Sequence, residues 1–195
     1  MTDPRKDQTG VSRRRFLRLG VAGGTAIALG SAFAWNVSGY VVPDLVRRSL
    51  VALTPKEYLI VKALAARVLR RDQDDLPTPE ELHVAAGIDR LVADLDEGNR
   101  ADLKKLLHLL EHALPWTVAR PSRFTRLDGA GQDAVLSSMM TSRVSILRGA
   151  FDSLKSLCVM AYFKDARTWG AIGYDGPLVG RPQTGWIPLR TRRPT

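Results

Sequence analysis

The side chains best suited to chemistry are two histidines and a glutamate close together in the sequence. His108 and His112 flank Glu111 in the order His-x-x-Glu-His, which on a helix places both imidazoles on one face. Two imidazoles one turn apart can bind zinc, so a zinc enzyme using His108 and His112 is one hypothesis. No third ligand accompanies them, and the leucines between and before them indicate packing. We therefore predict no metal site and no catalytic residue on this chain.

Cys158 is the only cysteine of the chain. One cysteine excludes an internal disulfide, a Cys-x-x-Cys site and any cluster held by several thiolates of this chain. Two interpretations of Cys158 stay open: a bridge to a partner subunit, or a small buried side chain. Its place one turn after Leu154 on an apolar helix face favours burial.

A glycine pattern at Gly129-x-Gly131-x-x-Ala134 has the spelling of a dinucleotide-binding loop. No predicted strand precedes it and no parallel sheet is expected to hold it, so we interpret it as a turn and a helix start. No nucleophile elbow and no phosphate-binding loop occur elsewhere. We predict that the chain is not an enzyme and carries no cofactor of its own.

The N-terminus has the pattern of a twin-arginine export signal. Ser12, Arg13, Arg14, Phe16 and Leu17 occupy the motif positions, and a basic residue follows. The stretch 19–42 holds no charged residue and is rich in glycine and alanine in its first part. We therefore predict a signal peptide over 1–34 that the twin-arginine translocase recognises.

Two fates of this signal stay open. Ala32 and Ala34 provide the small side chains that a signal peptidase requires, which predicts cleavage after Ala34. Alternatively, the uncharged stretch 19–42 is long enough to remain as a membrane anchor. Either fate predicts a periplasmic location, or one on the periplasmic face of the inner membrane.

The net charge of +9 is concentrated at the two ends of the chain. Basic residues exceed acidic ones by four in 1–34 and again by four in the basic tail 181–195, so the region between is almost neutral. A nucleic-acid-binding protein instead gathers its basic residues on the folded surface that meets the phosphates. We therefore expect no nucleic-acid partner.

Apolar residues at helical spacing predict an all-α fold, with a linker over 35–53 and one domain over 54–180. A capping box at Thr54 starts a first helix that runs to about Arg71. The same signal at Thr78 predicts the start of a second helix, which Gly98-Asn99 ends. Three further helices are expected over 100–114, 134–142 and 144–163. These elements predict a single helical bundle of about five helices with an irregular, aromatic-rich C-terminal segment.

Large aromatic rings lie among glycines and prolines in this C-terminal segment. Such rings must pack on the bundle itself or on a partner, and both interpretations agree with the composition. Tyrosine and tryptophan are also enriched where protein partners bind most strongly. The candidate interface residues are Tyr162, Trp169, Tyr174, Asp175 and Pro177.

The order of these features over about residues 50 to 180 resembles the gluconate 2-dehydrogenase subunit 3 family. The resemblance includes the Leu-Thr-Pro-Lys-Glu helix start at 53–57, Leu-Pro-Thr-Pro at 76–79, Arg123-Phe124, Phe-Asp-Ser-Leu-Lys at 151–155 and Ala-Tyr-Phe at 161–163. The stretch from Trp169 to Pro177, with Gly-Tyr-Asp-Gly-Pro at its end, is the most specific part.

This resemblance implies a non-catalytic small subunit of a flavin-dependent sugar or alcohol dehydrogenase. Its partner would be a catalytic subunit of the glucose-methanol-choline (GMC) type that carries FAD, with a multihaem cytochrome c as a further subunit of some complexes. The small subunit would assist assembly and lend its export signal to the catalytic subunit. The alternative is a free-standing helical binding protein, either periplasmic or anchored in the membrane.

Overall fold

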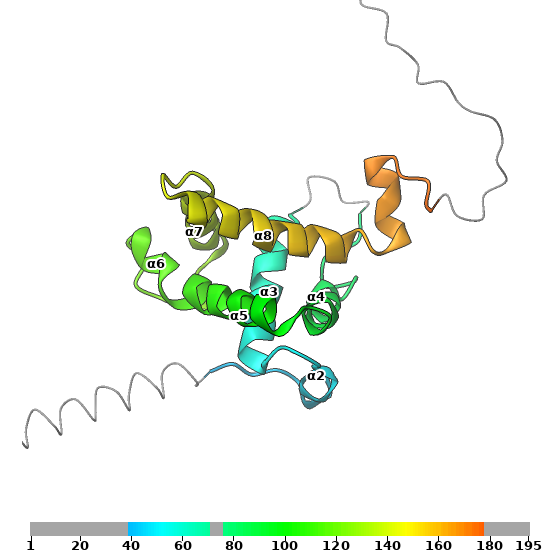
Figure 1. The fold of residues 1–195 in the computed structure, drawn as a ribbon, viewed down its shortest axis with the longest axis horizontal. Helices are drawn as coiled ribbons and strands as arrows, with labels where there is room; N and C mark the ends of the chain where they lie inside the picture. Colours follow the sequence, from blue (N-terminus) through cyan, green and yellow to red (C-terminus); the bar gives the residue numbers. More distant parts are fainter. Residues whose placement is uncertain (1–38, 71–75, 178–195) are drawn as a thin grey trace, which may run out of the picture.

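The computed structural model describes residues 39–70 and 76–177 (Figure 1). The export-signal residues Ser12 to Leu17, the cleavage-site residues Ala32 and Ala34, and the basic tail 181–195 lie outside these ranges. The described part of the chain is helical and contains no strand, which confirms the all-α fold. None of its helices is long and apolar enough to cross a membrane.

Five of the described helices have ten residues or more, as the sequence predicts for the bundle. The elements in chain order are α2 (Asp44–Ser49), α3 (Pro55–Val68), α4 (Val84–Ala93), α5 (Glu97–His112), α6 (Leu114–Thr117), the 3-10 helix η1 (Phe124–Arg126), α7 (Gly129–Met140), α8 (Ser145–Tyr162) and the 3-10 helix η2 (Ala166–Ile172).

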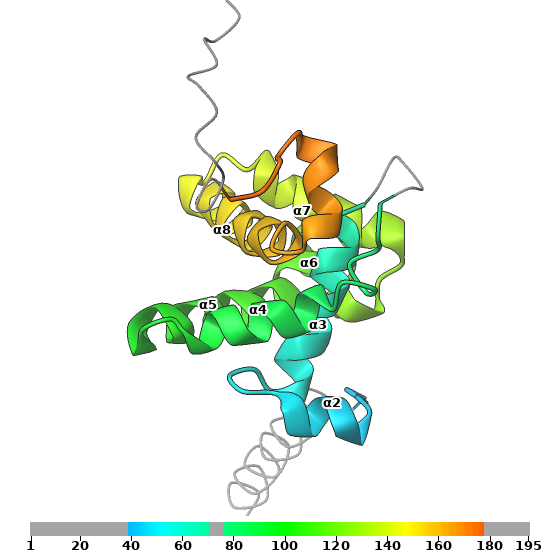
Figure 2. The ribbon, with the colours of Figure 1, turned by 90° about the vertical axis from the view of Figure 1, so that its right-hand side faces the viewer.

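Helix α3 is the central element of the bundle and packs against α4, α5, α7 and α8. Figures 1 and 2 show α8 crossing one part of α3, whereas α4 and α5 lie against another. Ile60, Val61 and Leu64 of α3 are completely or almost completely buried there. These side chains form one apolar core with residues such as Ile88, Leu107 and Leu154 from the surrounding helices.

The predicted capping box at Thr54 is present. The Thr54 hydroxyl accepts a hydrogen bond from the Glu57 N–H at 3.3 Å, and Glu57 Oε2 accepts one from the Thr54 N–H at 2.8 Å. Each side chain therefore satisfies a backbone donor that the first turn leaves free. The helix ends at Val68, slightly before the predicted end at Arg71.

The second helix starts later than predicted. Thr78 and Glu81 form the expected reciprocal hydrogen bonds, but these close a separate turn. His83 follows in the left-handed conformation with φ of 49°, and α4 begins only at Val84. A residue with positive φ interrupts the helical hydrogen-bond series, so the capping pattern marks a turn and not the helix start.

The predicted stop at Gly98-Asn99 is also wrong. Helix α4 ends at Ala93, and both residues lie in the first turn of α5. Asp96 caps α5 by accepting a hydrogen bond from the Asn99 N–H at 3.0 Å. An aspartate three residues before this N–H makes a stronger start signal than the glycine makes a stop signal. The glycine pattern at Gly129 does begin a helix, but this helix, α7, starts five residues before the predicted start at 134.

The segment before α3 is held to the bundle by a buried carboxylate. Asp89 on α4 is 2% exposed and accepts hydrogen bonds from the backbone N–H groups of Val51, Ala52 and Leu53 at 2.7, 3.0 and 2.7 Å. Within the predicted linker 35–53, residues 51–53 are therefore fixed to α4, and Leu53 is part of the core.

Candidate functional site

The histidine pair does not assemble a metal site. The rings of His108 and His112 are stacked with centroids 6.5 Å apart, and His108 Nε2 lies 3.5 Å from Glu57 Oε1. Glu111 is completely buried and bonded to other groups. Over residues 39–70 and 76–177, no three histidine, cysteine, aspartate or glutamate side chains are grouped so that they could hold a metal ion.

Glu111 instead receives three hydrogen bonds from two distant parts of the chain. The Tyr40 hydroxyl donates to Glu111 Oε1 at 2.6 Å, the Thr125 hydroxyl donates to the same oxygen at 2.6 Å, and the Thr125 N–H donates to Oε2 at 3.0 Å. Arg123 and Lys56 lie over the Tyr40 ring, at 5.1 and 5.6 Å from its centroid. This arrangement satisfies a buried carboxylate and fixes Tyr40.

His112 lies beside these positive charges. Burial, followed by the charges of Lys56 and Arg123, lowers the pKa of His112 to about 4. Its Nε2 atom is buried and has no hydrogen-bond partner within the described residues. The imidazole is therefore neutral at pH 7, which is a structural consequence of packing and does not by itself indicate catalysis.

Cys158 is completely buried in α8, which confirms the interpretation as a small core residue. Burial raises the pKa of its thiol to about 12, so the reactive thiolate is scarce at neutral pH. A bridge to a partner would require this thiol to leave the core.

The candidate interface residues lie at and after the end of α8, and the first of them belongs to the core. Tyr162 is 4% exposed and donates its hydroxyl hydrogen to the Pro77 carbonyl at 2.8 Å. It packs edge-on against Phe163. Tyr162 is thus part of the core beneath the C-terminal aromatic residues, and too little of its side chain is exposed for direct contact with a partner.

Trp169 and Tyr174 form the outer part of the segment. Asp165 caps η2 by accepting a hydrogen bond from the Arg167 N–H at 2.9 Å. Trp169 Nε1 donates to the Phe163 carbonyl at 2.8 Å, which directs the indole back toward α8. Tyr174 packs edge-on against this indole with centroids 5.1 Å apart. The structure therefore brings these two candidate residues together.

The surface of this aromatic segment, here residues 166–177, is accessible. Tyr174 is 45% exposed and Ile172 is 55% exposed, whereas Trp169 is half-buried. Asp175 and Pro177 are exposed as well. A Trp–Tyr pair with an exposed face is the type of surface on which partner proteins bind tightly, because aromatic side chains bury a large area and have few rotatable bonds to order.

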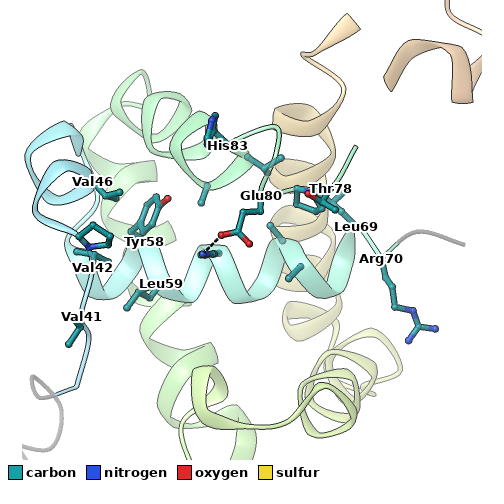
Figure 3. Close-up of a pocket in the computed structure, with 17 residues that line it drawn as sticks. Val41, Val42, Val46, Tyr58, Leu59, Leu69, Arg70, Thr78, Glu80 and His83 are labelled. Carbon is teal, nitrogen blue, oxygen red and sulfur yellow. Dashed lines mark hydrogen bonds and ion pairs between the residues drawn. The ribbon is translucent and has the colours of Figure 1, made fainter. Parts of the chain in front are cut away.

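A groove of about 700 Å³ lies at another part of the molecule, between α2, α3 and the turn before α4 (Figure 3). Val42, Val46 and Tyr58 contribute apolar side chains at one end, and Leu69 and Thr78 lie toward the other. An ion pair between Lys62 and Glu80, 2.7 Å long, crosses the lining. Apolar side chains predominate in the lining, and Lys62, Arg70, Glu80 and His83 add polar groups, a mixture that small-molecule and peptide sites often have.

Sequence reasoning missed both Tyr40 and Asp89 as anchors. Asp89 lies one turn after Ala85, on the buried stripe of its helix, so an acidic residue at an apolar position was an available signal. Tyr40 had no such signal, because its partner Glu111 is distant in sequence.

The fold and the segment together define a class of small all-α domain whose organised C-terminal surface is suited to binding. The family model described as gluconate 2-dehydrogenase subunit 3 matches residues 55–176. The chain belongs to the gluconate 2-dehydrogenase subunit 3 family, that is, to small subunits of a dehydrogenase complex. No curated protein and no solved structure matches the chain.

Proposed function

We propose that this chain is the non-catalytic small subunit of a periplasmic flavin-dependent sugar or alcohol dehydrogenase. Its catalytic partner is a GMC-type subunit that carries FAD, with a multihaem cytochrome c subunit as a further member of the complex. The observation that carries the proposal is the family match over residues 55–176. The Trp169–Tyr174 surface supports it, because a subunit needs an organised surface for its partner.

We propose further that the chain escorts this partner through the twin-arginine translocase. The motif from Ser12 to Leu17 lies N-terminal to the domain, on the same chain. A flavin enzyme binds its cofactor before export, so it must cross the membrane folded, and one signal can carry a docked pair. The small subunit then contributes the export signal and a surface for assembly, and the catalytic subunit contributes the chemistry.

The escort proposal is tested by changing Arg13 and Arg14 to lysine together. The variant should leave the flavin dehydrogenase and its activity in the cytoplasm. Arg15→Lys is the matched control, because it makes the same chemical change at the variable position of the motif. Normal periplasmic activity in the double variant would exclude the escort role, whereas co-purification of the two subunits would still report on the assembly role.

The groove between α2 and α3 favours a second function, a free-standing helical binding protein of the periplasm or its membrane. A chain of this kind would purify from the periplasm as a monomer without a flavoprotein. The absorption spectrum of the affinity-purified chain distinguishes the two functions, since a co-purifying GMC-type subunit adds the two flavin bands in the visible and near-ultraviolet.

A further inference from the structure

The described chain begins at the end of the molecule that carries α2, and this end has an unusual surface. Figures 1 and 2 show α2 and the start of the described chain together, with η2 and the aromatic segment toward the opposite end. Val41 is 86% exposed and Leu45 is 82% exposed. Val51, after the helix, is exposed as well. We call Val41, Leu45, Val51, Arg47 and Arg48 the α2 surface.

The apolar residues of the α2 surface are largely exposed to solvent. Val41, Val42 and Val46 line the groove beside α3, yet Val41 is 86% exposed, and Leu45, which is outside the groove lining, is 82% exposed. Figure 3 shows Val41 at the end of the groove where Val42 and Val46 also lie. Exposed large apolar side chains beside basic ones are typical of surfaces that lie in the headgroup region of a bilayer.

The charge at this end is mainly positive. Arg47 and Arg48 are exposed, and Asp44, which pairs with Arg47, supplies the acidic group of the helix. The Arg126 guanidinium lies close to Gly39: a Cβ atom added to this glycine would be 3.0 Å from Nη2 of Arg126. Lys56 lies nearby over the Tyr40 ring. Basic side chains next to exposed apolar ones favour anionic lipid over neutral lipid.

The position of the uncharged stretch 19–42 indicates that the partner of the α2 surface is a lipid bilayer. This stretch ends at Val42, next to Val41 of the α2 surface and just before α2 begins at Asp44. Tyr40 is held by Glu111, which fixes the direction in which the chain enters the domain. A segment that inserts into a membrane must therefore bring α2 to the lipid surface.

We propose that the α2 surface lies on an anionic bilayer and holds the domain with its aromatic segment directed away from the membrane. The inference rests on the proposed export of the chain and on retention of the stretch 19–42 as a membrane anchor, and it goes beyond the proposed function by assigning a lipid partner to α2. Val41 and Leu45 enter the headgroup region, and Arg47 and Arg48 contact lipid phosphates. The Trp169–Tyr174 surface is thereby left free for the catalytic subunit.

The test uses the full chain reconstituted in vesicles of phosphatidylcholine and phosphatidylglycerol. An environment-sensitive fluorophore is attached at Leu45→Cys, and in a matched control at Ile172→Cys at the opposite end. Cys158 can stay in place, because burial keeps its thiol unreactive. The Leu45 fluorophore should shift to the blue, be quenched by nitroxide lipids and be shielded from iodide, whereas the Ile172 fluorophore should remain open to iodide.

Equal iodide quenching at both positions would overturn the proposal. Shielding of Leu45 that appears only after the flavin subunit is added would also overturn it, and would assign the surface to a protein. Arg47→Gln with Arg48→Gln in the labelled chain tests the charge: nitroxide quenching should fall toward the level seen in phosphatidylcholine alone. Equal quenching in both lipids would reject the anionic preference. The experiment contains neither translocase nor flavin subunit, so its failure is distinct from failure of the proposed function.

Discussion

Tyr40 donates a hydrogen bond of 2.6 Å to Glu111, which connects the start of the described chain to a completely buried carboxylate of the bundle. Gly39 precedes it with φ of 90°, a conformation that other residues adopt only with strain. Burial, followed by the hydrogen bond to Glu111, raises the pKa of Tyr40, so the hydroxyl keeps its proton. The segment before α2 is thus joined to the bundle at one defined position.

Tyr40→Phe should lower the free energy of unfolding by about 1–2 kcal/mol, because a buried carboxylate loses one of its donors. The two bonds from Thr125 remain. Urea titration followed by circular dichroism measures the change. Tyr174→Phe is the control, since this tyrosine is exposed, and should change stability by less than about 0.5 kcal/mol. Equal effects of the two variants would show that the Glu111 bond adds no stability.

Asp89→Asn should lower the free energy of unfolding by about 2–4 kcal/mol. One amide oxygen cannot replace the two carboxylate oxygens that accept hydrogen bonds from three backbone N–H groups. Asp94→Asn, at the C-cap that follows the same helix, is the control, because its side chain is exposed. Hydrogen exchange locates the effect: the amides of Val51, Ala52 and Leu53 should lose protection in Asp89→Asn. Unchanged protection there would refute the anchoring role.

The sequence allowed the fold class and the main helices to be predicted, because apolar stripes report which face of a helix is buried. The Thr54 capping box was also confirmed, because its hydrogen bonds involve only residues that are close together in the sequence. The pattern at Thr78 looked identical, yet the structure uses it in a turn that His83 closes. Local signals therefore predict individual hydrogen bonds better than they predict whether a helix continues beyond them.

The contact between Tyr40 and Glu111 could not be predicted in the same way. Glu111 appeared beside two histidines and suggested metal chemistry, whereas its hydrogen bonds go to Tyr40 and Thr125. These contacts depend on how α5 packs against η1 and against the segment that contains Tyr40. The spacing of apolar residues along the sequence does not describe this packing. The Trp169–Tyr174 pair was anticipated by composition, but the burial of Tyr162 required the packing of α8.

Acid should destabilise the domain through His112. Its pKa is about 4 in the folded state and 6.5 in the unfolded reference, so the unfolded state binds more protons between these values. Its contribution to stability is present above pH 6.5 and is lost as the pH falls toward 4. The loss is on the order of 1 kcal/mol once solvent screening at a half-buried site is allowed for.

The measurement is the free energy of unfolding of the protein and of His112→Gln at pH 7 and pH 4.5. The glutamine variant should lose less stability on acidification. His83→Asn is the control, because this exposed residue has a positive φ that asparagine tolerates, and its pH dependence should follow the unmodified protein. If His112→Gln loses as much stability between pH 7 and pH 4.5 as the unmodified protein, groups other than His112 cause the loss.

The proposed interface predicts different effects for two exposed aromatic residues. Tyr174→Ala should weaken binding of the flavin subunit at least about tenfold, because it removes the exposed ring that packs on Trp169. Trp116→Ala is the control: this ring is 64% exposed on α6, a helix on the opposite side of the bundle in Figure 1. Binding measured by titration of the purified subunits should be unchanged in Trp116→Ala. If both variants bind normally, the aromatic segment is not the interface.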